Sequence, residues 1–254
     1  MNQIPPFRRQ RAFFSQFTTT QLHLKNPWVV AFFSFSYPGF GHFLQHRYAS
    51  AFTLILWETF INFKANVNLG ILYSLIGDFD KAKEVLDTKW LIFYVSIYMF
   101  GIWDGYRTTV DLNKQYLLAD REDAPILNIK MGSLDMNYLD KRKPWLALLW
   151  SALFPGLGHL YLHNVISGFF IFVYTVSICY FGHILQSIHL TMLGNFVHAK
   201  EVLDMQWTLY LPSIFFFIIY DAYVSAVENN KLFEKEMSKY LRHNYQGKNY
   251  EFPI

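Results

Sequence analysis

The stretch SYPGFGHFLQHR, residues 36–47, places Pro-Gly-x-Gly-His inside an apolar run, and LFPGLGHLYLHN, residues 153–164, repeats the pattern. When the chain is shifted by 117 residues, it aligns with itself without a gap. From residue 27 to residue 114, 30 of 88 positions are identical to their partners, and AKEVLD occurs unchanged at 82–87 and 199–204. Identity at one register over this length predicts a tandem duplication.

The composition indicates a membrane protein. Only 16% of the residues are charged and 53% are hydrophobic, whereas a soluble domain carries about a quarter charged residues. No Asp, Glu, Lys or Arg occurs from Pro144 to Ala199 or from Asn26 to His46. Because a helix needs roughly 20 apolar residues to cross a bilayer, these stretches predict transmembrane segments. The polar run QFTTTQLHLKN is not expected of a signal peptide, and the net charge of +3 gives no reason to expect nucleic acid as a partner.

Each repeat follows one plan. An apolar segment broken at its Pro-Gly pair precedes an apolar helix, an amphipathic stretch and a second apolar helix. We therefore expect an all-α integral membrane protein of two tandem parallel repeats, each with a broken or re-entrant apolar segment, two transmembrane helices and an amphipathic helix. The expected divisions are a cytoplasmic N-terminal segment (1–24), a first membrane repeat (25–114), a polar cytoplasmic linker (115–141), a second membrane repeat (142–231) and a cytoplasmic tail (232–254).

The distribution of Lys and Arg favours four membrane spans over six. If the broken segments enter the membrane and return, 17 of the 22 Lys and Arg residues share one side with both termini. Since cytoplasmic flanks carry an excess of these residues, both termini of this multi-pass protein are expected on the cytoplasmic side of the cell membrane. The stretch NPWVVAFFSFSYPGFGHFLQ is nevertheless long enough to cross if its helix tolerates the proline, so six spans stay open.

The second repeat contains Pro155-Gly156-Leu157-Gly158-His159-Leu160-Tyr161-Leu162, followed by Asp221-Ala222-Tyr223. This pattern resembles that of the small integral-membrane TM2-type modules. The first repeat matches more loosely, with Leu44 in place of the tyrosine and Gly105 inside the Asp-x-Tyr triplet. The insertion that ends in AKEVLD departs from the compact hairpin of those modules. The resemblance implies a multi-pass membrane protein without an established chemistry.

A histidine follows the break in each apolar segment, and three interpretations of His42 and His159 are open. Proline removes a backbone donor and glycine permits positive φ, so each imidazole could bond the carbonyls that its own break frees. Histidine also titrates near neutrality, which suits a proton or ion relay. Contact with a lipid headgroup is the third interpretation. No carboxylate or thiol lies at ligand spacing, so neither a metal nor a cofactor is expected. The residues of the break motif are Pro38, Gly39, Gly41, Pro155, Gly156 and Gly158.

Two aspartates lie near the cytoplasmic ends of the second apolar helices. On the four-span topology the broken segments end on that side too, so we predict that His42 packs against Asp104 and His159 against Asp221. Such a pair would satisfy two polar groups within each repeat. The alternative is that each aspartate reaches the membrane interface alone.

Glu58 is the one charged residue within the first apolar helix, and Thr175 occupies the matching position of the second repeat. Acidic residues inside a membrane are candidates for function. Glu58 lies six residues, about 9 Å of helix rise, from Lys64. We therefore expect Glu58 to reach the interface or to pair with Lys64.

The stretch ending in AKEVLD carries Ile71, Leu75, Phe79, Ala82 and Leu86 near helical spacing, which predicts one amphipathic helix. Its polar side would bring residues 83 and 87 together, four positions apart. Identity between the two copies suggests a contact surface on the outer face, and the alternative is a helix that lies on the lipid headgroups. The candidate contact residues are Lys83, Glu84, Asp87, Lys200, Glu201 and Asp204.

The sequence favours a non-enzymatic membrane protein with a structural, assembly or regulatory role. Its expected partners are the lipid bilayer and either another membrane protein or a second copy of the chain, and its two repeats are expected to pack about a pseudo-twofold axis. A small transporter or channel is the first alternative, because duplicated units with interrupted helices build transport sites. A lipid-acting membrane enzyme that uses the His-Asp pair for acid–base chemistry is the second.

Overall fold

The computed structural model describes residues 9–246, which are mostly helical. The first half contains β1 (Ala12–Phe14), β2 (Thr19–Gln21), α1 (Pro27–Ser36), α2 (Phe40–Leu44), α3 (Tyr48–Ala65), α4 (Val67–Leu75), α5 (Phe79–Val85) and α6 (Thr88–Glu122). The second half contains β3 (Ile129–Met131), β4 (Met136–Tyr138), α7 (Pro144–Leu153), α8 (Leu157–Tyr161), α9 (Val165–Phe181), α10 (Ile184–Met192), α11 (Phe196–Val202), α12 (Met205–Thr208) and α13 (Tyr210–Tyr245).

Elements of the two halves begin 117 positions apart, from the hairpins β1–β2 and β3–β4 through to α5 and α11. The single helix α6 corresponds to α12 and α13 together. Pro212 explains this difference, because a proline inside a helix lacks an N–H and its ring clashes with the carbonyl four residues earlier. That carbonyl belongs to Thr208, where α12 ends.

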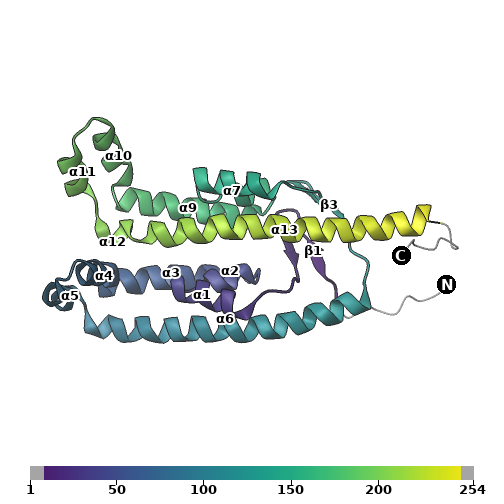
Figure 1. Ribbon diagram of the computed structural model, residues 1–254, viewed down its shortest axis with the longest axis horizontal. Coiled ribbons are helices and arrows are strands. Elements are labelled where there is room, and N and C mark those ends of the chain that lie inside the picture. Colours follow the sequence, from purple (N-terminus) through teal and green to yellow (C-terminus); the bar gives the residue numbers. More distant parts are fainter. Residues whose placement is uncertain (1–8, 247–254) are drawn as a thin grey trace, which may run out of the picture.

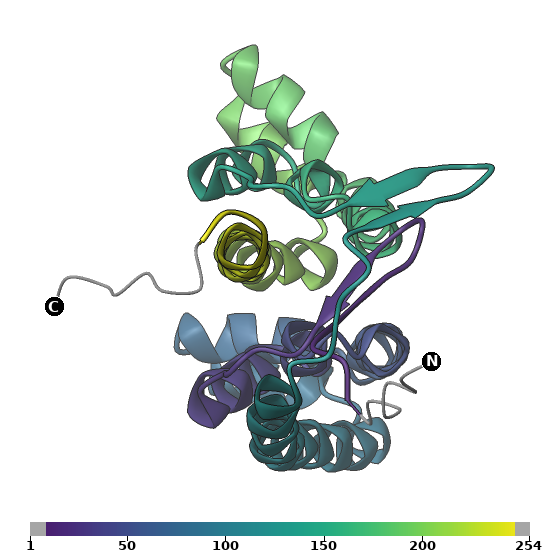
Figure 2. The ribbon, with the colours of Figure 1, turned by 90° about the vertical axis from the view of Figure 1, so that its right-hand side faces the viewer.

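The halves lie in layers along the long axis of the molecule, in the order α6, α1–α3, α13 and α7–α9 (Figures 1 and 2). Each half thus has its long helix on the same side, so the two halves follow one another in the same orientation. This arrangement corrects the expected packing about a pseudo-twofold axis. Phe217 of α13 stacks on Phe40 of α2 with 4.1 Å between ring centroids, whereas Ala222 and Ala226, on another side of α13, pack with Ala147 of α7. One helix is thus covered by both halves.

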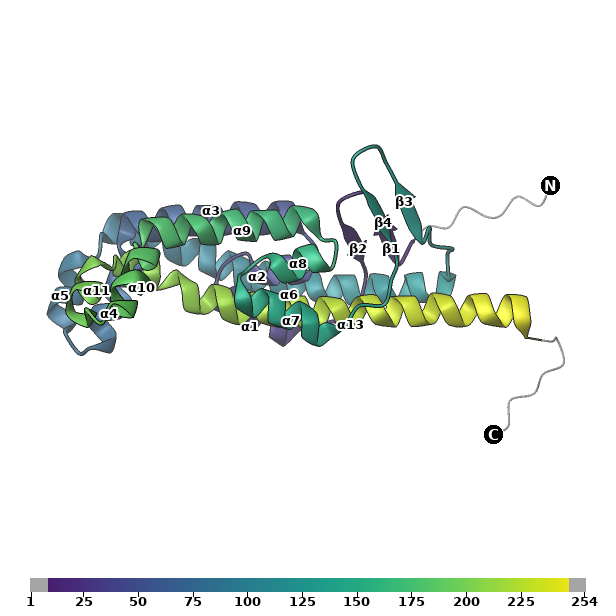
Figure 3. The same ribbon diagram turned by 90° about the horizontal axis from the view of Figure 1, so that it is seen from above.

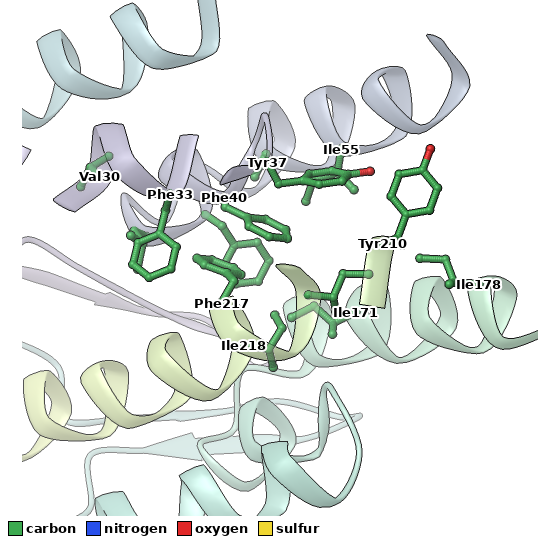
Figure 4. Close-up of a cluster of buried hydrophobic side chains, with 14 residues drawn as sticks. Val30, Phe33, Tyr37, Phe40, Ile55, Ile171, Ile178, Tyr210, Phe217 and Ile218 are labelled. Carbon is green, nitrogen blue, oxygen red and sulfur yellow. The ribbon is translucent and has the colours of Figure 1, made fainter. Parts of the chain in front are cut away.

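The core occupies the boundary between the halves (Figure 4). The first half contributes aromatic side chains from the broken segment, and the second half contributes residues of α9 and α13. The buried members are Val30, Phe33, Tyr37, Phe40, Phe43, Leu44, Ala51, Ile55, Ile171, Ile178, Tyr210, Ile214, Phe217 and Ile218. Packing between the halves therefore combines aromatic and aliphatic side chains.

The broken segment turns back on itself. Helix α1 has ten residues, a length of about 15 Å, or half of a hydrocarbon core. Gly39 adopts a φ of 103°, which glycine tolerates, and α2 then returns alongside α1. A Cβ on Gly41 would lie 2.0 Å from Ser34 Oγ and 2.7 Å from the Val30 carbonyl oxygen. The close approach of α2 to α1 therefore requires glycine at position 41.

By length and composition, one segment among residues 9–246, Met205–Tyr245, could cross a membrane on its own. Up to three could if two bent pairs each count as one span. These pairs are Phe79–Val85 with Thr88–Glu122, bent by 93°, and Val165–Phe181 with Ile184–Met192, bent by 64°. The chain thus has a candidate membrane-spanning helix.

The stretch ending in AKEVLD forms two short helices, which corrects the expected single amphipathic helix. Gly77 breaks the first copy with a φ of 85°, and Gly194 breaks the second. Lys83 approaches Asp80 at 3.5 Å, while the Asp87 side chain accepts a hydrogen bond from the Lys89 backbone N–H at 2.9 Å. Position 87 therefore caps the next helix instead of pairing with position 83, because the chain has already left the helix there.

Figure 3 shows that both β-hairpins lie beside the long helices, near the end where the described chain starts and stops. The expected N-terminal segment and linker each contain one of these hairpins. Helix α6 continues to Glu122 and α13 to Tyr245, so the expected boundaries at 114/115 and 231/232 fall inside helices. The outer ends of the chain, 1–8 and 247–254, lie outside the described residues.

Candidate functional site

The buried His42 and the half-buried Asp104 form the first of two histidine–aspartate pairs. His42, only 1% exposed, lies on α2, and its Nε2 is 2.9 Å from Asp104 Oδ2 on α6. Arg47 Nη1 donates to the same carboxylate oxygen at 2.6 Å, and Thr108 Oγ1 donates to Oδ1 at 3.3 Å. The packing hypothesis drawn from the sequence is confirmed here, and Asp104 also has a cationic partner.

The second pair lacks that cation. His159 Nε2 lies 2.7 Å from Asp221 Oδ2, and both residues are buried, at 1% and 5% exposed. Asn164 occupies the position that matches Arg47, and its Oδ1 accepts a hydrogen bond from the Thr19 backbone N–H of the first hairpin at 3.2 Å. The two halves therefore share the histidine–aspartate pair and differ in what lies beside it.

Neither imidazole bonds the carbonyls of its own break, which corrects the simplest sequence interpretation. Backbone groups satisfy those carbonyls instead: the Phe40 N–H donates to the Tyr37 oxygen at 3.1 Å, and the Phe43 N–H donates to the Gly39 oxygen at 2.9 Å. The two breaks touch each other through Phe43 and His159, whose ring centroids are 5.7 Å apart at 86°. Through Asp104 and Asp221, the histidines thus link each break to the long helix of its own half, α6 or α13.

Glu58 is buried at 1% exposed between the halves, so the expected approach to the interface or to Lys64 is wrong. Asn62 Nδ2 donates to Glu58 Oε1 at 2.9 Å. The hydroxyls of Tyr37 and Tyr94 also interact with this carboxylate. Local polar partners one helical turn away, together with tyrosines from other helices, hold the side chain inside the protein.

An amide network continues from Glu58 across the boundary between the halves. Gln206 of α12 donates through Nε2 to Asn62 Oδ1 at 2.9 Å, and its Oε1 accepts from the Leu69 backbone N–H at 3.0 Å. Asn68 Nδ2 donates to the Gln206 carbonyl oxygen at 2.8 Å. Asn62, Asn68 and Gln206 are all at most 7% exposed. This network is polar, buried and shared by both halves.

Three hydroxyl groups extend the same layer. The Tyr37 hydroxyl lies 2.8 Å from Thr59 Oγ1 and 2.7 Å from the Tyr174 hydroxyl, and Thr59 Oγ1 lies 2.7 Å from the Tyr174 hydroxyl. Tyr37 and Thr59 belong to the first half and Tyr174 to the second. This cluster was not predicted from the sequence, because neither tyrosine stands out within a chain that is 20% aromatic.

A second polar site lies further along α13, near the start of α1. Lys25 Nζ donates to Glu228 Oε1, and His46 Nε2 lies 3.8 Å from Glu228 Oε2. Glu228 is 3% exposed. Burial raises the pKa of the Glu228 carboxyl, but the His46 imidazole and the Lys25 ammonium outweigh it and lower that pKa to about 2. Glu228 is therefore a buried carboxylate that the neighbouring Lys25 and His46 side chains favour in its ionised form.

The far ends of α6 and α13 are joined by charge. The buried Arg11 of the first hairpin approaches Asp120 and Glu236, at 3.5 and 2.7 Å. Lys235 of α13 donates to Asp120 of α6. The hydrogen bond from Lys235 lowers the pKa of the Asp120 carboxyl. These ion pairs hold the two long helices together at the end nearer the termini.

The AKEVLD candidates lie at the opposite end of the molecule (Figure 1). Four of them are on α5 and α11, and Asp87 and Asp204 follow as the N-caps of α6 and α12. Lys83, Glu84, Lys200 and Glu201 are exposed. Asp204 caps α12 by accepting a hydrogen bond from the Gln206 backbone N–H at 2.9 Å. These residues lie far from the histidine–aspartate pairs along the long axis of the molecule, so the two groups do not form one site.

Among the described residues 9–246, no group of three or more His, Cys, Asp or Glu side chains is placed to hold a metal ion. Comparisons with protein-family models, curated proteins and solved structures gave no match to this chain. The resemblance to TM2-type modules therefore stays a prediction from its motif residues.

Proposed function

We propose that this chain is a multi-pass integral membrane protein of two tandem repeats with a structural or assembly role. The observation that carries the proposal is the large exposed apolar surface of α7 and α9, which contain no charged residue, and of the apolar part of α6. Trp145 and Leu149 of α7, Val173 of α9 and Phe93 of α6 are 57–68% exposed. Monomeric soluble proteins rarely expose contiguous apolar patches of more than a few hundred Å², so a lipid environment fits this surface better than water.

In this proposal α3, α9, the apolar part of α6 (89–108), and the segment 206–226, which runs from α12 into α13, cross the bilayer. The pairs α1–α2 and α7–α8 enter and return, because α1 and α7 each have ten residues, about 15 Å of helix. Glu228 and the ion pairs beyond it lie outside the bilayer. Both long helices run from the α4–α5 and α10–α11 end toward the ends of the described chain (Figure 1), which supports parallel repeats.

A structural role is supported by how the polar groups are used. His42, His159 and Glu58 are each only 1% exposed and interact with a partner inside the chain. The bonds of the two histidines join different helices, and hydrogen bonds between helices stabilise a bundle in lipid by roughly 0.6 kcal/mol on average, up to about 2. The same burial leaves a lipid substrate without access to either imidazole, so catalysis is less well supported.

Membrane fractionation tests this proposal. The full chain should sediment with membranes and stay there through an alkaline carbonate wash, because transmembrane segments resist that extraction. Release of folded chain into the supernatant would contradict an integral membrane protein.

A second candidate function is transport of a proton or a small cation. The observation in its favour is Glu58, a carboxylic acid at the boundary between the halves that several hydroxyl groups and amides surround. Reconstituted liposomes would report it: a proton or cation flux that Glu58→Gln abolishes supports transport. A flux equal to that of empty liposomes would leave only the structural role.

A further inference from the structure

The two halves contact each other through unlike faces. The first half presents a broken-segment face, defined here as Phe33, Phe40 and Phe43. The second half presents a long-helix face on α13, defined as Tyr210, Phe217 and Tyr220. The Phe217 ring lies 4.1 Å from Phe40, 5.3 Å from Phe33 and 5.6 Å from Phe43, measured between centroids. A contact between unlike faces is heterologous, so it leaves one face of each kind unused at the two ends of the stack.

The unused long-helix face lies on α6. Its members, 117 positions before those of α13, are Phe93, Phe100 and Trp103. They are exposed by 57%, 51% and 55%, whereas Tyr210 and Phe217 are exposed by 2% and 0%. The first half therefore carries the same ring positions as α13, with phenylalanine again at the central one, and none of them is covered to the same degree.

The unused broken-segment face lies on α7 and α8. Its members, 117 positions after those of the first half, are Trp150, Leu157 and Leu160. Trp150 is 42% exposed, whereas Phe33 is 2% exposed, and both leucines are half-buried. The side chains remain large and apolar, so this face keeps the chemistry of the occupied one.

Charge complementarity is kept as well. The ion pair between Lys25 and Glu228 crosses the boundary between the halves. The matching positions are Arg142 and Asp111, which carry the same signs and lie in the two layers that form the outer ends of the stack. Asp111 is 57% exposed and lies 3.5 Å from Lys114, one helical turn away. Arg142 lies 3.3 Å from Asp140, two residues before it.

The hairpins differ in the same way. Phe14 of the first hairpin is 5% exposed, and the Phe17 carbonyl oxygen accepts a hydrogen bond from the Val165 N–H of the second half at 2.8 Å. The matching residues of the second hairpin, Met131 and Leu134, are 70% and 79% exposed. The second hairpin thus lacks the contact that covers the first.

We propose that a second copy of this chain occupies the free faces, so that Phe100 of one copy enters the Trp150, Leu157 and Leu160 face of the next. Asp111 of the first copy then pairs with Arg142 of the second. The contact copies the one inside the chain, which joins parallel halves, so all copies point the same way across a bilayer. A heterologous contact of this kind builds a ring or an open row. The inference rests on the proposed function, which supplies the membrane around these faces.

Cysteine cross-linking in membranes tests the inference. In a Cys179→Ser chain, Phe100→Cys and Leu157→Cys are introduced singly and together, and a mild oxidant is added. The double variant is expected to give a ladder of dimers, trimers and higher species. Each single variant should stay monomeric, and two differently tagged single variants that are coexpressed should give only the mixed dimer. Phe100→Cys with Val173→Cys is the matched control, because Val173 and its counterpart Leu56 are both exposed and belong to neither face.

Charge reversal provides a second readout that does not alter the apolar faces. Asp111→Arg should lower the cross-linking yield of the double-cysteine chain about twofold to fivefold, the effect of an exposed ion pair, and Arg142→Asp in the same chain should restore it. Absence of the ladder, or homodimers from Phe100→Cys alone, would overturn the inference, since lipid, another protein or a symmetric dimer would then cover the faces. Recovery of the chain in the membrane fraction is scored separately, so a failure of the proposed function is recognised on its own.

Discussion

Glu228→Gln is expected to destabilise the folded chain by about 3 kcal/mol at neutral pH. Glu228 is 3% exposed and contacts Lys25 and His46 across the boundary between the halves. Its pKa falls from 4.5 to about 2 in the folded protein. At about 1.4 kcal/mol for each pKa unit, ionisation of this one carboxyl contributes about 3 kcal/mol. Removal of one partner of a buried ion pair costs a similar amount, roughly 3–5 kcal/mol.

The sign follows from the lowered pKa. A carboxyl that is a stronger acid in the folded state than in the unfolded state stabilises the fold fully above pH 4.5, and that stabilisation is lost as the pH falls through about 2. The wild-type chain should therefore lose stability between pH 4.5 and pH 2 by about 3 kcal/mol more than Glu228→Gln does.

The assay is thermal unfolding in detergent micelles, followed by circular dichroism at several pH values between 2 and 7. Asp111→Asn is the matched control, because Asp111 occupies the corresponding position of the first half and is 57% exposed. Removal of the Asp111 charge should change the unfolding midpoint little when the chain is a monomer in detergent. Equal losses for the two variants, or a wild-type midpoint independent of pH below 4.5, would refute the argument.

Three further predictions concern buried contacts. Alanine at His159 and at Asp221, singly and together, should give a coupling free energy of roughly 0.5–3 kcal/mol in unfolding, and additive losses would exclude their contact. Gly41→Ala should cost about 1–3 kcal/mol, measured as a lower unfolding midpoint, because its Cβ would lie 2.0 Å from Ser34 Oγ; an unchanged midpoint would contradict the tight return of α2. Gln206→Ala should cost roughly 1–3 kcal/mol and speed amide hydrogen exchange in α4, whereas unchanged exchange would contradict the network between the halves.

The sequence predicted the histidine–aspartate pairs because the four-span topology places the broken segments and the aspartates on the same side of the membrane in both repeats, at 42 and 104 and at 159 and 221. It also placed the break between α1 and α2 correctly, since proline and glycine act on the local backbone. These features depend on residue type and short-range geometry, which a single chain displays directly.

The position of Glu58 could not be predicted in the same way. Two of its partners lie outside its own helix, Tyr37 after α1 and Tyr94 on α6. The expected pair with Lys64 rested on α3 alone. The two hairpins were also missed, because strands of three residues within polar segments give no period. Asp87 was placed beside Lys83 on the polar side of one amphipathic helix, although an aspartate before a helix is a common cap.

The order of the layers is the third feature that sequence could not supply. Matching residues in the two halves have unequal exposure, as Phe217 at 0% and Phe100 at 51% show. A duplicated sequence states which residues correspond, but only the packed structure shows which copy of each face is used. The inference about a second chain therefore became possible only from the structure.

The central claim is that two parallel repeats span a membrane with both termini on one side, and cysteine accessibility measures it most directly. In a Cys179→Ser chain, Lys83→Cys and Lys200→Cys are labelled in sealed vesicles with a maleimide that does not cross membranes. The account predicts that both positions react from the same side, opposite to a cysteine placed at Lys235. Reaction of positions 83 and 200 from opposite sides would contradict it.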